Sequence, residues 1–361
     1  MVKAAVCRAF GEPLAIEEVT LARPGPGEVA VDVKACAICH SDISYAEGAW
    51  GGPLPAVYGH EAAGVVAAVG RGVKSVKPGD HVIVTLIRSC KSCRYCKSGS
   101  EVMCEEVFPL DKQGPIRSAK GEDVWAAMRS GAFAQRMVAH ESQMVKAPKS
   151  MPFATASLLS CGVITGFGAV ANSAHVKAGD AVVVVGCGGV GLNVIQGAKH
   201  AGAGRIVALD LSEAKLKDAR KFGATHAVNA AAGDPAAAIK KACGGRGADF
   251  AFVTVGAGPA YEQAFRYIGK NGAVVAIGMA ANGVTIKVDP TIVAAWSQKM
   301  IGSKMGDSVI SRDIPRLIRA WSKGELKLDE LITHTFPLEK INEAIAEVKA
   351  GKARRNVIVF D

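Results

Sequence analysis

The chain has 361 residues, of which 49% are hydrophobic and 21% are charged, and its formal net charge at pH 7 is +10. This length is about 2.4 times the ~150 residues of a typical domain, which argues against a single small module and predicts two domains, each with its own core. The N-terminal segment lacks the apolar run of a secretory signal, and no apolar stretch approaches the roughly 20 residues that span a bilayer. We therefore expect a cytoplasmic protein without a membrane partner.

The positive net charge does not by itself indicate a nucleic acid partner. Lys and Arg are scattered along the chain, and an aromatic content of 6% offers few side chains for stacking on bases. We expect no nucleic acid partner, whereas a basic excess suits anionic ligands such as a dinucleotide. In a reducing compartment, clustered cysteines indicate metal ligands or catalytic thiols rather than disulfides, so the spacing of the ten cysteines is informative.

The first third of the chain alternates short β-branched runs with Gly and Pro. These runs predict strands over Glu28–Cys36, Ala62–Val69 and His81–Leu86 and favour a mostly antiparallel β domain. Residues 90–131 break the pattern with Lys, Arg, Ser, Gly and Cys, and we expect a lobe or a long loop there.

From about Asp180, apolar runs alternate with amphipathic segments of helical length. The runs predict the strands of a doubly wound parallel sheet, over Ala181–Val185, Arg205–Leu209, Phe250–Val255 and Ala273–Ile277. Two helical patterns, Arg312–Lys323 and Leu338–Ala350, precede a last strand, Asn356–Phe360. Because that strand is too short to form a domain, we expect it to return to the first domain, which then encloses an inserted α/β domain.

A glycine-rich turn joins the first of these parallel strands to a helical pattern. Its sequence is Gly186-Cys187-Gly188-Gly189-Val190-Gly191. Glycines at this spacing let the turn close and let backbone N–H groups approach a pyrophosphate at the positive end of a helix dipole. Asp210 follows the next strand and can accept hydrogen bonds from an adenosine ribose, which favours NAD over NADP. Lys215 could reach the same ribose or simply lie in solvent.

Four cysteines lie within fifteen residues, at Cys90, Cys93, Cys96 and Cys104. Four thiolates suit a closed tetrahedral zinc site, which would stabilise a small lobe of about residues 88–105 that has little apolar content. A redox pair or unliganded thiols are the alternatives, but neither explains four cysteines so closely grouped.

Three further residues, Cys39, His60 and Cys161, form a second candidate metal site. Two thiolates and an imidazole with one open position define the catalytic zinc site of alcohol dehydrogenases. Taken singly, each residue is more simply explained as a buried structural cysteine or a core histidine. Together with the predicted dinucleotide site, the three are better explained as ligands.

With these motifs, the chain resembles the zinc-dependent medium-chain alcohol dehydrogenases over essentially its full length. The matching motifs are Cys39-His40-Ser41-Asp42, Gly59-His60-Glu61, the four-cysteine segment, Cys161 with Thr165-Gly166, the glycine-rich turn, Asp210, and Gly351-Lys352 with Arg354-Arg355. The resemblance implies a GroES-like, mostly-β catalytic domain over residues 1–162 and 305–361 and a Rossmann domain over residues 163–304.

The resemblance also implies roles for single residues. Cys39, His60 and Cys161 would hold a catalytic zinc ion, Glu61 would be a second-sphere or transient ligand, and Asp42 would orient His60. Ser41 would take the hydroxyl proton of the substrate. Where similar forms of the family carry a histidine that passes this proton onward, the chain has Ser44, so water or His40 would take that part. The remaining cofactor contacts would be Thr165 and Val190 at the nicotinamide, His40 and Arg355 at the pyrophosphate, and Asp210 and Lys215 at the ribose. Ile277 would be a further cofactor contact.

The positions that line the family's substrate pocket are apolar in this chain: Trp50, Leu86, Phe108, Met128, Ile277 and Met279. They favour a primary or secondary alcohol of apolar or aromatic character, oxidised reversibly with NAD and two Zn²⁺ ions per chain. The long segment between Cys104 and Cys161 resembles the dimeric forms more than the tetrameric ones. Alternatives are an S-(hydroxymethyl)glutathione dehydrogenase, a polyol dehydrogenase and, more remotely, a non-catalytic zinc or nucleic-acid-binding protein.

Overall fold

A computed structural model describes residues 1–361, which divide into two compact units. A catalytic unit contains Met1–Cys161 and Val309–Asp361, and a nucleotide unit contains Gly162–Ser308. The second boundary lies four residues later than the predicted 304/305. Residues 304–308 remain with the nucleotide unit because Gly306 packs backbone to backbone against Gly168, and the Ser308 hydroxyl bonds the Ile164 carbonyl at 3.2 Å.

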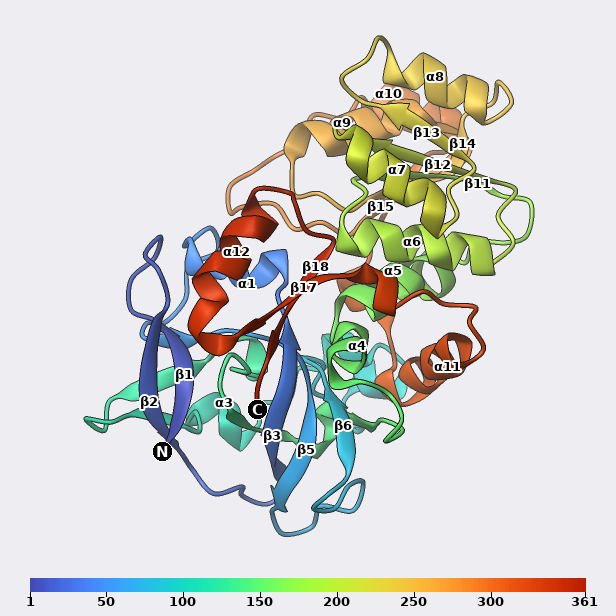
Figure 1. The fold of residues 1–361 in the computed structure, drawn as a ribbon. Coiled ribbons are helices and arrows are strands. Elements are labelled where there is room, and N and C mark those ends of the chain that lie inside the picture. The colour runs from blue at the N-terminus through green and yellow to red at the C-terminus, as the bar shows by residue number, and fades with distance from the viewer. The chain divides into compact units, whose positions relative to one another are not determined.

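Two β-structures form the catalytic unit (Figure 1). A closed barrel runs β1 (Val2–Cys7), β2 (Ala15–Leu21), β7 (Ile116–Ser118), β8 (Asp123–Ala126) and β4 (Ala56–Val57). A sheet runs β10 (Met144–Lys146), β6 (His81–Val84), β5 (Glu61–Val69), β3 (Glu28–Ala37), β18 (Arg355–Val359) and β17 (Ile332–Pro337), with β9 (Arg136–His140) also on β3. The segment that the sequence suggested as a loop thus supplies two strands of the barrel.

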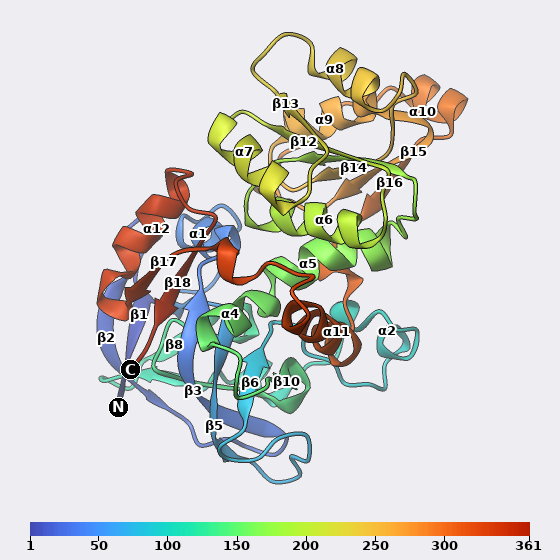
Figure 2. The same cartoon turned by 45° about the vertical axis from the view of Figure 1, so that its right-hand side comes forward.

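Apolar side chains from both β-structures share one core, which includes Val6, Val31, Tyr58 and Phe133. Four helices of this unit are short: α1 (His40–Ala46), α2 (Arg94–Lys97), α3 (Pro109–Lys112) and α4 (Phe153–Ser157). The two helices near the C-terminus, α11 (Ile310–Ser322) and α12 (Ile341–Lys349), are longer. Figure 2 shows the last strands beside β3, the return to the first domain that the sequence predicted.

The nucleotide unit is a six-stranded parallel sheet with helices between its strands. Its strand order is β13 (His226–Asn229), β12 (Arg205–Asp210), β11 (Ala181–Val185), β14 (Ala248–Val253), β15 (Ile268–Ala276) and β16 (Lys299–Gly302). Numbered from its first strand this is the order 3-2-1-4-5-6 of a Rossmann sheet, which reverses between β11 and β14. The helices are α5 (Gly162–Gly168), α6 (Gly189–His200), α7 (Glu213–Phe222), α8 (Pro235–Ala242), α9 (Gly258–Tyr267) and α10 (Pro290–Trp296).

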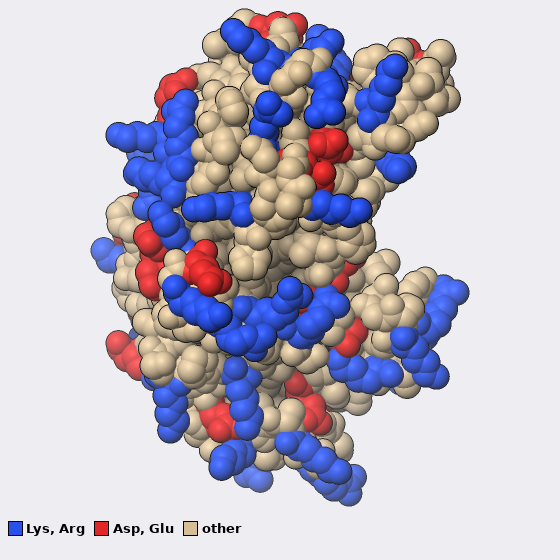
Figure 3. All heavy atoms as spheres, turned by 90° about the vertical axis from the view of Figure 1, so that its right-hand side faces the viewer, with Lys and Arg blue, Asp and Glu red and all other residues tan.

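Two further observations concern membrane and nucleic acid partners. None of the helices combines the length and the apolar character that crossing a bilayer requires. Figure 3 shows Lys and Arg at many places on one face, with acidic side chains among them.

Candidate active site

The catalytic unit brings Cys39, His60, Glu61 and Cys161 together, with their ligating atoms all within 4.8 Å of one another. Cys39 lies between β3 and α1, His60 directly precedes β5, Glu61 begins that strand, and Cys161 follows a 3₁₀ turn, Leu158–Ser160. All four residues are buried, and none of the ten cysteines forms a disulfide. Thiol, imidazole and carboxyl groups gathered in this way are a donor set for zinc.

Asp42 fixes the orientation of the His60 ring. His60 Nδ1 lies 3.0 Å from Asp42 Oδ1, so this nitrogen donates to the carboxylate. The same carboxylate accepts hydrogen bonds of 2.9 Å from the backbone N–H groups of Cys39 and Gly59. Gly59 has φ of +89°, and a Cβ there would lie 2.6 Å from the Phe133 nitrogen, so the turn before His60 requires glycine.

The other ring nitrogen, His60 Nε2, is buried and has no hydrogen-bond partner. A buried polar atom without a partner is costly and needs an explanation. A metal ion shared with Cys39 and Cys161 supplies one, because a ligating imidazole typically donates its second nitrogen to a carboxylate. The thiol of Cys161 and the His60 ring also lower the pKa of Cys39 well below its ordinary value against the effect of burial. The residues therefore fit zinc.

Glu61, a member of this cluster, forms a buried ion pair with Arg355. Burial raises the pKa of Glu61 to about 7, even though Arg355 opposes the shift. The guanidinium is 6% exposed and directed at Glu61, whereas the family resemblance had suggested that Arg355 contacts a cofactor pyrophosphate. The structure places Arg355 as the partner of Glu61 because its strand, β18, lies next to β3, which in turn pairs with β5.

Cys90, Cys93, Cys96 and Cys104 form a second cluster, again with sulfurs within 4.8 Å of one another. Backbone N–H groups point at the sulfurs: Cys93 N lies 3.2 Å from Cys90 Sγ, and Cys90 N lies 3.3 Å from Cys104 Sγ. Hydrogen bonds from Ser92 lower the pKa of Cys90 to about 6, which favours its thiolate. Phe108 is the only large side chain in this lobe's core, so a metal ion is a reasonable source of its stability.

In the nucleotide unit, the glycine-rich turn has the three features of a dinucleotide fingerprint. Gly186 has φ of +89°, as a tight turn requires. A Cβ on Gly191 would lie 1.9 Å from the Gly186 carbonyl oxygen, so the helix packs closely on the strand. A Cβ on Gly188, in contrast, would meet nothing within 4 Å, which leaves the space that a pyrophosphate requires.

Asp210 closes this turn from the end of β12. Its carboxylate accepts hydrogen bonds from the backbone N–H groups of Cys187, at 2.8 Å, and Ser212, at 2.9 Å. The side chain of Ser212 then caps α7 by accepting from the Lys215 N–H. The carboxylate is thus held beside the turn, and Lys215 lies in the first turn of α7. These residues fit an adenosine ribose.

The other predicted residues occupy varied surroundings. His40 and Ser41 begin α1, Thr165 is buried in α5, Val190 begins α6, and Ile277 follows β15. Trp50 contacts Tyr45 edge to face with ring centroids 4.9 Å apart, and Leu86 follows β6. Met279 is 67% exposed. Phe108 packs in the core of the four-cysteine lobe and against the His140 ring, which explains its apolar character without a substrate.

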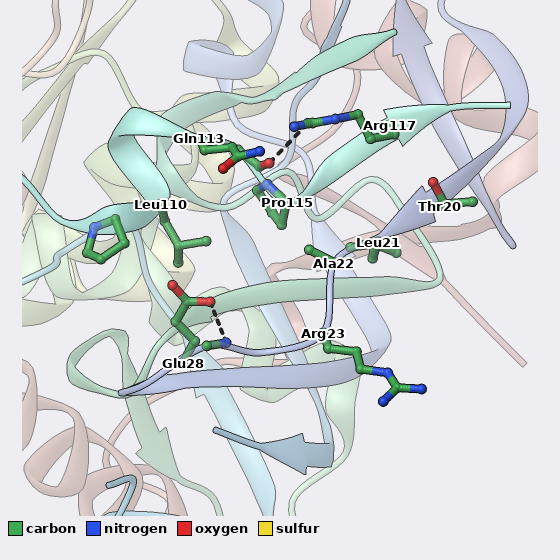
Figure 4. Close-up of a pocket in the computed structure, with 12 residues that line it drawn as sticks. Thr20, Leu21, Ala22, Arg23, Glu28, Leu110, Gln113, Pro115 and Arg117 are labelled. Carbon is green, nitrogen blue, oxygen red and sulfur yellow. Dashed lines mark hydrogen bonds between the residues drawn. The ribbon is translucent and has the colours of Figure 1, made fainter. Parts of the chain in front are cut away.

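A separate hollow of about 480 Å³ lies between β2, β3 and α3 (Figure 4). Glu28 points into it from β3 and accepts a hydrogen bond from the Gly25 N–H at 2.9 Å, and Arg117 bonds the Gly114 carbonyl at 3.2 Å. None of the residues predicted from the sequence lines this hollow. It therefore has no part in the candidate site.

Known proteins are similar to this chain in sequence and fold. Residues 25–149 match the family model "Alcohol dehydrogenase GroES-like domain", and residues 189–323 match "Zinc-binding dehydrogenase". An NDMA-dependent alcohol dehydrogenase of Amycolatopsis methanolica is 38% identical over 367 residues, which is 99% of this chain and 98% of the relative. An S-(hydroxymethyl)glutathione dehydrogenase of Haemophilus influenzae is 36% identical over 370 residues, 99% of this chain and 97% of the relative.

Among solved structures, benzyl alcohol dehydrogenase from Acinetobacter calcoaceticus superimposes with a TM-score of 0.93 at 28% identity, over 100% of this chain and 99% of that one. Fold, donor sets and relatives together define a zinc-binding oxidoreductase that acts on alcohols. The chain belongs to the zinc-dependent medium-chain alcohol dehydrogenase family. The predicted fold class and family are confirmed.

Proposed function

We propose that the protein oxidises an uncharged, apolar or aromatic alcohol to the aldehyde or ketone, with NAD as cofactor and two zinc ions per chain. The observation that carries this proposal is the buried, unpartnered His60 Nε2 beside the thiols of Cys39 and Cys161. The open space at Gly188 and the anchored carboxylate of Asp210 support NAD. The apolar side chains at the pocket positions that the family resemblance implies, such as Trp50 and Leu86, support an apolar substrate.

Cys39, His60 and Cys161 would hold the catalytic zinc ion, and the four-cysteine lobe would hold the structural one. Bound zinc would lower the pKa of an alcohol hydroxyl, and bound NAD would accept hydride. Ser41, in the first turn of α1, would accept the hydroxyl proton. Asp42 keeps His60 in the tautomer that ligates, and Asp210 binds the ribose hydroxyls and repels a 2′-phosphate.

A panel assay tests this function. NADH formation at 340 nm would be followed with primary, secondary, aromatic and polyol alcohols, and zinc would be counted in the same preparation. We expect turnover of apolar alcohols with NAD and not NADP, two zinc ions per chain, and loss of activity in Cys39→Ala. Failure of every alcohol in the presence of two zinc ions and bound NAD would refute the substrate class.

Two named relatives supply alternatives that the same panel separates. Formaldehyde with glutathione tests the reaction of the S-(hydroxymethyl)glutathione dehydrogenases, which the positive net charge of this chain would suit. NDMA as acceptor tests whether the protein, like its Amycolatopsis relative, depends on that compound. Turnover that requires NDMA would show the same dependence in this protein.

We also propose that the protein is a homodimer that joins two copies of β16. This strand is the edge of its sheet, and large apolar side chains are exposed on or near it: Val284, Val288, Ile292, Trp296 and Met300. An open edge with apolar neighbours can pair with its own copy across a two-fold axis. Light scattering should give a dimer, and Met300→Lys should give a monomer; an unchanged dimer in that variant would exclude this interface.

A cytoplasmic location is part of the proposal because six zinc-binding thiols must stay reduced.

A further inference from the structure

A buried pair of side chains, Arg88 and Gln143, joins the start of the four-cysteine lobe to the turn between β9 and β10. Arg88 is 2% exposed and Gln143 is fully buried. Neither residue belongs to a motif of the family resemblance. A guanidinium without solvent needs a reason to be there, since burying a charge is costly unless the charge is paired and hydrogen-bonded.

The guanidinium of Arg88 is bound on several sides. Its Nε donates to Gln143 Oε1 at 2.8 Å, its Nη1 donates to Asp111 Oδ1 at 2.8 Å, and its Nη2 donates to the Arg129 carbonyl at 3.4 Å. The guanidinium carbon also lies 5.3 Å from the centroid of the Phe108 ring. The planar fork of arginine meets all these partners, which a lysine could not.

The amide of Gln143 is bound on both its oxygen and its nitrogen. Its oxygen accepts from Arg88 Nε and from the His140 N–H at 3.2 Å. Its nitrogen donates to the Thr85 carbonyl at 2.8 Å and to the Arg129 carbonyl at 3.0 Å. Two donors face the oxygen and two carbonyls face the nitrogen, so only one orientation of this amide satisfies all four groups.

Both side chains therefore converge on the carbonyl of Arg129, which lies in an unusual turn. Met128 and Arg129 have φ of +51° and +60°, the left-handed region that residues other than glycine rarely adopt. Such conformations persist only where the surroundings hold them. The two hydrogen bonds to the Arg129 carbonyl are such a restraint.

This turn is bonded to the segment that carries His60. The Ala132 N–H donates to the Gly59 carbonyl, and the Phe133 N–H donates to the Tyr58 carbonyl, each at 2.9 Å. The second partner of Gln143, Thr85, precedes Leu86 and directly follows β6, whose Val84 pairs with Ala62, two residues after His60. The pair thus ties together two segments that both border the candidate zinc site.

We propose that Arg88 and Gln143 are positioning residues that hold the Met128–Arg129 turn and the Thr85–Leu86 segment against each other beside the active site, and thereby set which alcohols it accepts. The inference rests on the proposed function and on the family resemblance, which implies that Leu86 and Met128 line the substrate pocket. Loss of the restraint lets the Met128 side chain move, so that large alcohols lose their fit while a small alcohol, which makes few contacts, is little affected.

Arg88→Met tests the proposal, with Arg136→Met as the matched control because Arg136 forms only an exposed pair with Asp32. We expect the ratio of kcat/KM for benzyl alcohol to that for ethanol to fall about tenfold in Arg88→Met, the size of a lost pocket contact, through KM of the aromatic alcohol. Arg88→Lys should recover part of the ratio, and the control should keep it. Zinc content should remain at two ions per chain in all variants.

A second variant and a second measurement keep the test decisive. If Arg88→Met does not fold, Gln143→Glu, which keeps the shape and the bond to Arg88 but removes both N–H groups, should lower the same ratio. Amide hydrogen exchange of residues 127–133 should be faster in either variant than in the wild type. Unchanged exchange overturns the restraint, and faster exchange with an unchanged ratio overturns the role in specificity.

The two proposals fail in different ways. If the wild-type protein oxidises no alcohol, the proposed function fails and the role in specificity falls with it. The exchange measurement still decides whether Arg88 and Gln143 restrain the turn, because it needs no substrate.

Discussion

Removing the carboxylate of Asp42 should release zinc from the catalytic site. Asp42→Ala leaves three buried donors without their acceptor, namely the His60 ring and the N–H groups of Cys39 and Gly59. The ring and the carboxylate are 0% and 1% exposed, so water does not take the place of the lost partner. The substitution should therefore affect both the orientation of a zinc ligand and the stability of the catalytic unit.

The magnitude follows from these contacts. Each of the two backbone N–H groups left unpaired costs about 1–3 kcal/mol, so the free energy of unfolding should fall by about 2–6 kcal/mol. Loss of the carboxylate that orients a ligating histidine typically weakens metal binding by about 10–100-fold. Asp42→Asn keeps an acceptor oxygen and should lose less of both quantities.

Zinc content after dialysis against a chelator, together with denaturant unfolding, measures both effects. The matched control is Asp32→Ala, because Asp32 forms a partly exposed pair with Arg136 at 2.6 Å and touches no predicted ligand. We expect the control to keep both zinc ions and Asp42→Ala to keep one. The reasoning is refuted if Asp42→Ala retains two zinc ions and unfolds at the denaturant concentration of the wild type.

Four further predictions follow from the same structure. Gly188→Ala should fold normally but bind NAD at least about tenfold more weakly, because its Cβ enters only the space left for the pyrophosphate. Gly191→Ala, in contrast, should unfold more easily. An NAD affinity of Gly188→Ala equal to that of the wild type, measured by calorimetry, would contradict the predicted pyrophosphate site. Asp210→Ala should lower the preference for NAD over NADP in initial rates, and an unchanged preference would mean that another group selects the cofactor. Cys104→Ala should lose one zinc ion of two and become sensitive to protease within residues 88–105; an intact count would exclude the four-cysteine site. Burial, followed by the charge of Arg88, lowers the pKa of His140, so the folded state binds fewer protons than the unfolded chain, and stability should be complete above a pH of about 6.5 and fall below it. In His140→Asn, the free energy of unfolding measured with urea should fall less between pH 7 and pH 5 than in the wild type. An equal fall would assign the effect to other groups.

The sequence predicted those parts of the fold and site whose residues lie close together in the chain. Short-range spacing identifies three of these features: the glycine-rich turn, the four-cysteine lobe, and the pair Cys39 and Asp42. Their motifs can therefore be recognised in the sequence alone. The strands Glu28–Ala37 and Glu61–Val69 differ from the predicted ranges by one residue each, because their apolar runs coincide with buried strands.

Contacts between distant residues could not be predicted in the same way. The pairing of Arg355 with Glu61 depends on the neighbours of β18, which no local pattern specifies. The bond between Arg88 and Gln143 spans 55 positions and joins two residues that look ordinary in the sequence. The family resemblance suggested Phe108 for the substrate pocket, and the packing of this ring against the cysteines of the lobe depends on the fold of residues 88–108. Only the burial of an unpaired charge or amide would have drawn attention to such residues.

The position of β18 inside its sheet has a consequence for how the protein is made. The nucleotide unit is complete once residue 308 has been synthesised, but the catalytic unit still lacks its last 53 residues, 309–361. At about 5–20 residues per second, the ribosome needs about 3–10 s to supply them, and during this time the thiols of Cys39 and Cys161 are present in an unfinished core. A stop codon at position 355 would delete β18, the strand between β3 and β17, and with it the partner of Glu61. Quality-control proteases should remove chains that lack this strand.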